Sequence, residues 1–272
     1  MIRLAVFLLM MPGLAHAACR QALSLGLDVS SSVDPSEYRL QIDGVIAALN
    51  ALSVQQILFI DPENPVRIHV FEWSGPVNQQ IVVPWTELAG PADLARVTET
   101  LRAHERGSPA PNTAIGSAML AGFGYLDQQP DCFLRTLDLS GDGETNTGPL
   151  PEEIGPEATP EGVVVNGLVV GSGNFFGDMV SLAGLEELRL YYLENVIRGP
   201  GAFVEVAVSY DDYAATMERK LLRELASLVI GGTPSGVARD GWSIPLQVGL
   251  SSGPGNLPSS ATARTTMKAR PR

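Results

Sequence analysis

The stretch ALSLGLDVSSS, residues 22–32, decides the fold of this chain. Its apolar run over Ala22–Asp28 predicts a buried strand that ends on a carboxylate. Hydroxyl side chains follow at Ser30 and Ser32. In an extended backbone, the alternation Asp-x-Ser-x-Ser directs these three oxygen-bearing side chains the same way. The stretch therefore predicts a strand that delivers a cluster of oxygen atoms to one edge of a sheet.

The residues after this stretch have the features of a helix start. Asp34 is the expected N-cap, Pro35 the first helical residue, and Glu37 completes a capping box. One face of the predicted helix is apolar at helical spacing, through Tyr38, Ile42, Val45, Ile46 and Leu49. A buried strand that leads into an amphipathic helix is the repeating unit of a parallel sheet covered by helices.

The same alternation continues along the chain. Further strands are expected over Val66–Glu72, Gln80–Val83, Phe133–Ser140, Val163–Val170 and Ala202–Val206. Helices are expected from Pro91, from Thr113, and from Ser209, where Asp212 would complete another capping box. The connection at residues 74–76 is short enough that the third strand should form an antiparallel hairpin with the second. The pattern predicts an α/β fold with three layers: a doubly wound, mostly parallel sheet with one short antiparallel edge strand.

The two ends of the chain differ from its body. Arg3, the apolar run Leu4–Met11 and the small residues around Ala17 have the order of a secretory signal peptide, so residues 1–17 are assigned to one. The apolar run is too short to span a bilayer, and no stable membrane insertion is expected after cleavage. Residues 231–272 are rich in Gly, Ser, Pro and Thr and are expected to be a disordered tail. One domain, residues 18–230, remains between them, exported to the periplasm or secreted.

Charge excludes one class of partner. Residues 18–230 hold 12 basic and 29 acidic side chains, whereas residues 231–272 hold five basic and one acidic. A body this acidic repels phosphate backbones and anionic lipid headgroups, so nucleic acid is excluded as its partner. Solubility explains most of these charges without any binding role.

Three groups of oxygen-bearing residues fall at the ends of the expected elements: Asp28, Ser30 and Ser32 after the first strand, Thr113 at a helix start, and Asp142 after the fourth strand. Ligands of parallel α/β sheets bind at the carboxyl ends of strands, where the strand order reverses. Carboxylate and hydroxyl oxygens suit a hard divalent cation, and we expect Mg²⁺, with Mn²⁺ or Ca²⁺ as alternatives. Each group taken singly is an ordinary turn or N-cap, but together they predict a metal site.

The combination of Asp28-x-Ser30-x-Ser32, a separate Thr113 and Asp142-Gly143 resembles the metal-ion-dependent adhesion site of von Willebrand factor A domains. The resemblance covers about residues 20–230. It implies that the ion binds a protein partner through a carboxylate that the partner offers. Further segments resemble an uncharacterised bacterial family of exported proteins with this domain: Glu72–Gly75, Leu139–Gly143 and Asn195–Phe203. One departure is Ser140-Gly141, where many family members have a single Thr before Asp-Gly.

The implied fold also places the two cysteines. Cys19 precedes Asp28 by nine residues and Cys132 precedes Asp142 by ten. Because the first and fourth strands are neighbours in this fold, the cysteines should lie side by side. An oxidising compartment then lets them form a disulfide. Zinc ligation is excluded, because two distant cysteines and two histidines in the mature chain do not form a zinc motif.

These features predict a metal-dependent protein-binding module for adhesion or assembly. The alternative is a metal-assisted phosphoesterase that uses the same acidic cluster. Such an enzyme needs a general base or an activated nucleophile, and the sequence shows neither beside the cluster. It also has no Gly-x-Ser-x-Gly elbow of serine hydrolases between a predicted strand and a predicted helix; the pattern Gly249–Gly253 lies in the expected tail. We therefore expect no catalytic activity.

Overall fold

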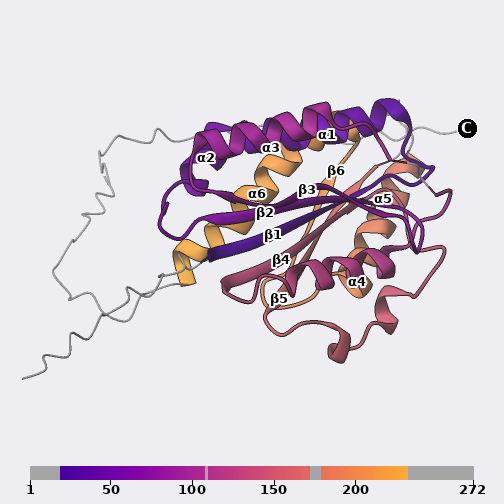
Figure 1. The fold of residues 1–272 in the computed structure, drawn as a ribbon. Helices are drawn as coiled ribbons and strands as arrows, with labels where there is room; N and C mark the ends of the chain where they lie inside the picture. Colours follow the sequence, from indigo (N-terminus) through magenta and orange to yellow (C-terminus); the bar gives the residue numbers. More distant parts are fainter. Residues whose placement is uncertain (1–18, 108–109, 172–178, 232–272) are drawn as a thin grey trace, which may run out of the picture. The chain divides into compact units, whose positions relative to one another are not determined.

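A computed structural model describes residues 19–107, 110–171 and 179–231. The expected signal peptide at residues 1–17 lies outside these ranges, as does the expected tail at residues 231–272 apart from Gly231, which ends a helix. Within them, six strands form one sheet in the order β3-β2-β1-β4-β5-β6, and helices cover both faces (Figure 1). The predicted three-layer α/β architecture is confirmed.

The sheet is parallel except at one edge, where β3 runs antiparallel to β2. The strands are β1 (Cys19–Asp28), β2 (Val66–Trp73), β3 (Gln79–Leu88), β4 (Cys132–Gly141), β5 (Val163–Val170) and β6 (Val204–Ala207). After β1 the chain builds outward through β2 and β3, and it then returns to place β4 on the other side of β1. The strand order therefore reverses between β1 and β4, where such folds bind their ligands.

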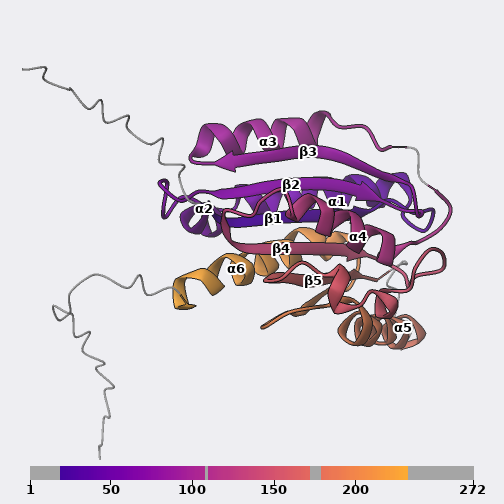
Figure 2. The same cartoon turned by 60° about the horizontal axis from the view of Figure 1, so that its bottom comes forward.

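Two helical layers enclose the sheet. One face is covered by α1 (Pro35–Asn50), α2 (Leu52–Leu58), α3 (Pro91–Ala103) and α6 (Tyr213–Gly231). The opposite face is covered by α4 (Ile115–Leu126) and α5 (Met179–Tyr191), as Figures 1 and 2 show. Each face has its own apolar core: Leu23, Leu25 and Leu27 belong to the first, and Leu137 and Leu139 to the second. No described helix is long and apolar enough to cross a membrane.

The start of α1 confirms the predicted capping box. The Asp34 side chain accepts hydrogen bonds from the backbone N–H groups of Ser36 and Glu37, and the Glu37 side chain accepts one from the Asp34 N–H. These bonds satisfy amide groups that the first turn of a helix leaves without partners. The predicted apolar stripe of α1 is buried as expected.

The third strand is longer than predicted. β3 spans ten residues, Gln79–Leu88, instead of the four over Gln80–Val83. Pro84 lacks an N–H group, but an edge strand tolerates proline because one side of the strand has no partner to bond. Pairing with β2 therefore resumes beyond Pro84, with Thr86 opposite Ile68, after a shift in register.

The predictions for the last third of the chain need correction. The last strand is β6, Val204–Ala207, and not Ala202–Val206. The Ser209 side chain forms no capping hydrogen bond; a 3₁₀ turn over Tyr210–Asp212 leads into α6 instead. Neither α2 nor α5 was expected from the sequence, and α5 continues as a π-helix over Tyr192–Val196.

The predicted disulfide is present. Cys19 and Cys132 lie opposite each other in the register of β1 and β4, with 4.3 Å between their Cα atoms, and their sulfur atoms are bonded. Both residues are buried at the amino ends of their strands. The bond therefore ties the two central strands together at the end of the sheet opposite to Asp28.

Candidate metal centre

The backbone turns away from the sheet directly after β1. The Ser30 N–H donates to Oδ1 of Asp28 at 2.7 Å, and the Val33 N–H donates to the Ser30 carbonyl at 3.1 Å. Aspartate favours such turns because its carboxylate accepts a hydrogen bond from the backbone two residues on. Asp28 itself is fully buried, whereas Ser32 is exposed. The loop therefore runs from the interior of the sheet edge to the surface.

A chain of hydroxyl groups links this loop to the end of β4. The Ser30 and Ser32 hydroxyls are 3.0 Å apart, and the Ser32 hydroxyl donates to Oδ1 of Asp142 at 2.6 Å. Ser32 and Asp142 are 110 residues apart in sequence. They meet because β1 and β4 are adjacent parallel strands whose carboxyl ends share one edge.

Thr113 reaches the same edge from the loop before α4. Its backbone N–H donates to Oδ1 of Asn146 at 2.9 Å, and its carbonyl accepts from the Asn146 N–H at 2.9 Å. A Cβ atom added to Gly143, the residue after Asp142, would lie 3.9 Å from the Thr113 hydroxyl. The structure thus gathers all five predicted residues at the carboxyl ends of β1 and β4, where the strand order reverses: Asp28, Ser30, Ser32, Thr113 and Asp142.

Burial makes the two carboxylates costly to ionise. Burial, and next the charge of Asp142, raises the pKa of Asp28 from its ordinary 3.8 to about 7. The pKa of Asp142 is also raised, mainly by burial, although the hydrogen bond from Ser32 opposes the shift. Two like charges at one buried edge destabilise each other unless a cation lies between them.

The oxygen atoms present fit a hard divalent cation. The Oδ2 atoms of Asp28 and Asp142 are both buried, and neither forms a hydrogen bond with another described residue. The Tyr210 hydroxyl lies near enough to Asp142 to lower its pKa, but it forms no hydrogen bond with Oδ2 of Asp142. Buried carboxylate oxygens normally have partners, so each suits a cation ligand. No three His, Cys, Asp or Glu side chains in the described ranges are arranged to hold a metal. The other oxygen-bearing side chains predicted for this edge are the hydroxyls of Ser30, Ser32 and Thr113.

Three residues that the sequence did not single out hold the loop of Asp28. Gln41 of α1 donates to the Asp28 carbonyl at 3.0 Å. Arg106 donates to the carbonyls of Val29 and Ser30 at 2.8 and 3.0 Å. The Ser31 hydroxyl donates to the Pro111 carbonyl at 2.9 Å, which joins the loop to the segment before Thr113. Gln41 had a readable signal, because it is a polar residue on the buried stripe of α1.

Buried Glu72, at the end of β2, anchors the segment that carries Arg106. Its Oε1 atom accepts from the Tyr38 hydroxyl at 2.7 Å and lies 3.0 Å from Nε2 of His104. Its Oε2 atom accepts from the Gly107 N–H at 3.0 Å. These bonds fix both flanks of Arg106, which in turn holds the loop after β1.

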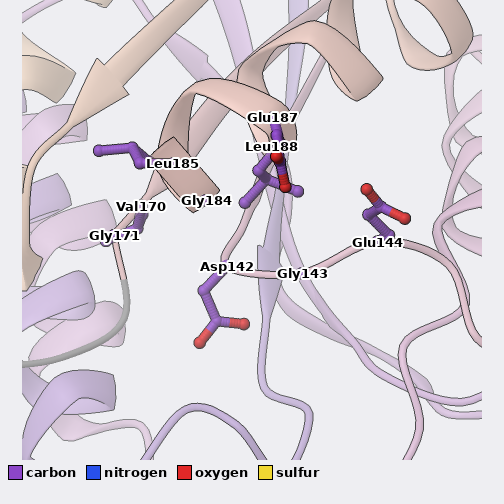
Figure 3. A pocket seen from close by; sticks show the side chains of 9 residues that line it. All are labelled: Asp142, Gly143, Glu144, Val170, Gly171, Gly184, Leu185, Glu187 and Leu188. Carbon is purple, nitrogen blue, oxygen red and sulfur yellow. The ribbon is translucent and has the colours of Figure 1, made fainter. Parts of the chain in front are cut away.

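A pocket of about 300 Å³ lies beside Asp142, between the ends of β4 and β5 and the helix α5. Val170, Leu185 and Leu188 supply its apolar lining, and Glu144 and Glu187 supply carboxylates. Figure 3 shows the Asp142 side chain pointing away from those of Glu144 and Glu187. The pocket therefore adjoins the five-residue cluster and shares Asp142 with it.

Several solved structures share the fold. Proximal thread matrix protein 1 from the mussel byssus is 16% identical, with a TM-score of 0.55, over 77% of this chain and 49% of that chain. The pilus adhesin SpaC from Lactobacillus rhamnosus GG is 13% identical, with a TM-score of 0.55, over 78% and 31%. A von Willebrand factor type A structure from Catenulispora acidiphila is 11% identical, with a TM-score of 0.51, over 76% and 43%.

These matches span less than half of each solved chain, and identities this low show the fold alone. Another structure of the mussel protein is described as having a zinc-occupied MIDAS motif. It is 17% identical, with a TM-score of 0.51, over 77% of this chain and 48% of that chain. No curated protein matches this chain. The family described as "Protein of unknown function (DUF1194)" matches residues 18–229. The chain has a von Willebrand factor A-like fold and belongs to this DUF1194 family.

Proposed function

We propose that this protein is an exported, metal-dependent binding module that attaches to another protein in adhesion or assembly. One divalent ion, Mg²⁺ or alternatively Mn²⁺ or Ca²⁺, is held by Asp28, Ser30, Ser32, Thr113 and Asp142, and it binds a carboxylate of the partner. The zinc-occupied motif of the mussel structure supports metal binding in this fold. The Cys19–Cys132 disulfide supports export, because disulfides persist in oxidising compartments.

One observation carries the proposal: the buried Oδ2 atom of Asp28 has no hydrogen-bond partner and lies in the field of a second carboxylate, Asp142. An isolated buried carboxylate is destabilising. A bound cation would satisfy the free oxygen and offset the repulsion between the two acids. The same edge of the sheet is the position where α/β folds of this topology bind ligands.

The composition of the cluster suits binding. The two carboxylates supply the negative charge, and the hydroxyls of Ser30, Ser32 and Thr113 add oxygen contacts without adding charge. A divalent ion held in this way acts as a Lewis acid that attracts a further carboxylate. Because Ser32 is exposed, a partner can reach this end of the cluster from solvent.

The rival function, a metal-assisted phosphoesterase, needs a general base near the cluster. His69 lies in the middle of β2 among Phe71, Trp85 and Tyr125, and burial lowers its pKa to about 4. His104 pairs with Glu72. Both histidines are therefore engaged in the structure, which favours binding over hydrolysis. Turnover of p-nitrophenyl phosphate with Mg²⁺, abolished by Asp28→Ala, would favour the enzyme instead.

Metal-dependent capture tests the proposal. The purified mature protein is immobilised and exposed to periplasmic extract in Mg²⁺, in chelator, and in chelator followed by excess Mg²⁺. The proposal expects a partner that is retained in Mg²⁺, released by chelator and recovered on Mg²⁺ addition. Asp28→Ala should retain none of it, whereas Asp43→Asn, an exposed aspartate on α1, should behave as wild type. Retention that survives both chelator and Asp28→Ala would contradict the proposal.

A further inference from the structure

Tyr192 lies in a slot made by two strand glycines. It is the first residue of the π-helix that continues α5, and it is fully buried. A Cβ on Gly167 of β5 would lie 2.7 Å from its ring, and a Cβ on Gly141 of β4 would lie 2.5 Å from its hydroxyl. Glycine inside a strand weakens the strand and marks a close approach by another group. Here two strands accept glycine so that one tyrosine can reach the edge of the sheet.

The hydroxyl of this tyrosine ends beside Asp28. A Cβ atom added to Gly141 would lie 2.5 Å from the Tyr192 hydroxyl and 3.2 Å from Oδ2 of Asp28. The hydroxyl and this carboxylate oxygen therefore flank the same small space above Gly141. The edge of the Trp73 indole, 3.4 Å from the added Cβ atom, closes another side. A tyrosine hydroxyl is protonated at neutral pH, so it can donate a hydrogen bond.

Within the described part of the chain, the Tyr192 hydroxyl is a hydrogen-bond donor without an acceptor, and Oδ2 of Asp28 is an acceptor without a donor. The Tyr192 hydroxyl is buried and forms no hydrogen bond with any described residue, and the same holds for Oδ2 of Asp28. Oδ1 of Asp28 is engaged with the Ser30 N–H. A carboxylate oxygen has two lone pairs, so Oδ2 can accept from Tyr192 with one and face a cation with the other. Leaving both groups without partners in the interior would be costly.

We propose that Tyr192 is a positioning residue of the metal centre. The two groups lie close together without a hydrogen bond in this structure, and a shift of either side chain lets the Tyr192 hydroxyl donate to Oδ2 of Asp28 and hold that carboxylate toward the ion. The inference rests on the proposed function, because it assigns a residue that acts on the metal through Asp28. Groups that orient a metal ligand in this way affect metal affinity even though they do not touch the metal. It also accounts for Gly141, where any side chain would separate the tyrosine from Asp28.

Calorimetric titration of the metal-free protein with Mn²⁺ compares wild type, Tyr192→Phe and Tyr213→Phe. Tyr213 is the matched control, because it is also fully buried, but its hydroxyl bonds to Ser140 at 2.9 Å. Tyr192→Phe should weaken Mn²⁺ binding about tenfold. Tyr213→Phe should lower stability and leave the affinity within about twofold, since its hydroxyl has no role at Asp28. Equal affinities in wild type and Tyr192→Phe would overturn the positioning role.

A second measurement needs no metal. Urea unfolding of wild type, Tyr192→Phe, Asp28→Ala and the double variant in chelator forms a double-mutant cycle. A coupling of about fivefold or more in the unfolding equilibrium constant supports the contact, and additive effects overturn it. Asp28→Asn replaces the alanine variant if that variant does not fold. If wild type takes up no metal, the proposed function fails, and the cycle still decides whether Tyr192 and Asp28 interact.

Discussion

Asp28 gives the metal-free protein an unusual dependence on pH. Its pKa is about 7 in the folded protein, against an ordinary value of 3.8. Between these values the folded protein holds a proton that the unfolded chain has released, so stability falls as the pH rises through this window. Above pH 7 both states are ionised, and the full cost, up to about 4 kcal/mol, is present.

Asp28→Asn should therefore stabilise the metal-free protein, by up to about 4 kcal/mol at pH 8 and by much less near pH 4.5. Urea unfolding in chelator at the two pH values measures the difference. Asp43→Asn, which changes the same atoms on an exposed part of α1, should stay within about 0.5 kcal/mol of wild type. An Asp28→Asn effect of equal size at both pH values would contradict the buried, partly protonated carboxylate.

Single residues were predictable from the sequence only where a local pattern marked them. The five clustered residues belong to short motifs whose resemblance to a known site placed them. Arg106 and Tyr192 carry no such pattern. Arg106 acts through hydrogen bonds to residues at least 76 positions away in the sequence, and Tyr192 packs against glycines of two strands. Only a structure brings such residues next to Asp28.

Among the elements, α4 positions Thr113 and packs tightly against the loop after β4. A Cβ on Gly116 would collide with the Pro149 carbonyl, whereas one on Gly124 would meet nothing within 4 Å. Gly116→Ala should cost about 1–3 kcal/mol and weaken metal uptake, since the displaced loop carries the Asn146 that holds Thr113. Gly124→Ala, in the same helix, should stabilise by about 1 kcal/mol with metal uptake unchanged. Thermal unfolding and metal titration of the pair test this packing; similar effects at both positions would refute it.

The pairing of β1 with β4 makes a different prediction for the disulfide. Replacing Cys19 and Cys132 by serine should lower the free energy of unfolding by up to about 4–5 kcal/mol, because the bond closes a loop of more than a hundred residues. Metal uptake should persist, since the bond lies about 30 Å away at the other end of the strands. Free-thiol titration of the denatured, unreduced protein checks the bond itself. Two reactive thiols in the exported protein would contradict it.

Elements with strong local signals were predicted well. The bounds of β5 and the capped start of α1 agree with the sequence pattern, because apolar runs and capping residues act locally. The extension of β3 past Pro84 depends on its place at the sheet edge, which no local pattern states. Seven-residue α2 is too short to show periodicity, and α5 has exposed leucines at 182 and 190 that blur its stripe.

At the scale of the whole molecule, every described strand and helix lies before residue 232. The predicted tail is also opposite in charge to the acidic body. Truncation after Gly232 should therefore change the melting temperature by no more than a few degrees and leave metal uptake intact. Differential scanning calorimetry of the full and truncated mature chains measures this. A larger fall in the melting temperature would mean that the tail packs on the domain.

Metal uptake through residues from three distant segments is the central claim, and isothermal titration with Mg²⁺ tests it most directly. Wild type should bind one ion, and at a concentration 100 times the dissociation constant that ion should add about 2.7 kcal/mol of stability. Asp28→Ala should abolish the binding heat. Thr113→Ala should weaken binding, because Thr113 reaches the cluster only through this fold, and Ser30→Ala and Ser32→Ala should have smaller effects. If wild type and Asp28→Ala took up Mg²⁺ equally well, the metal centre would be wrong, and with it the proposed function.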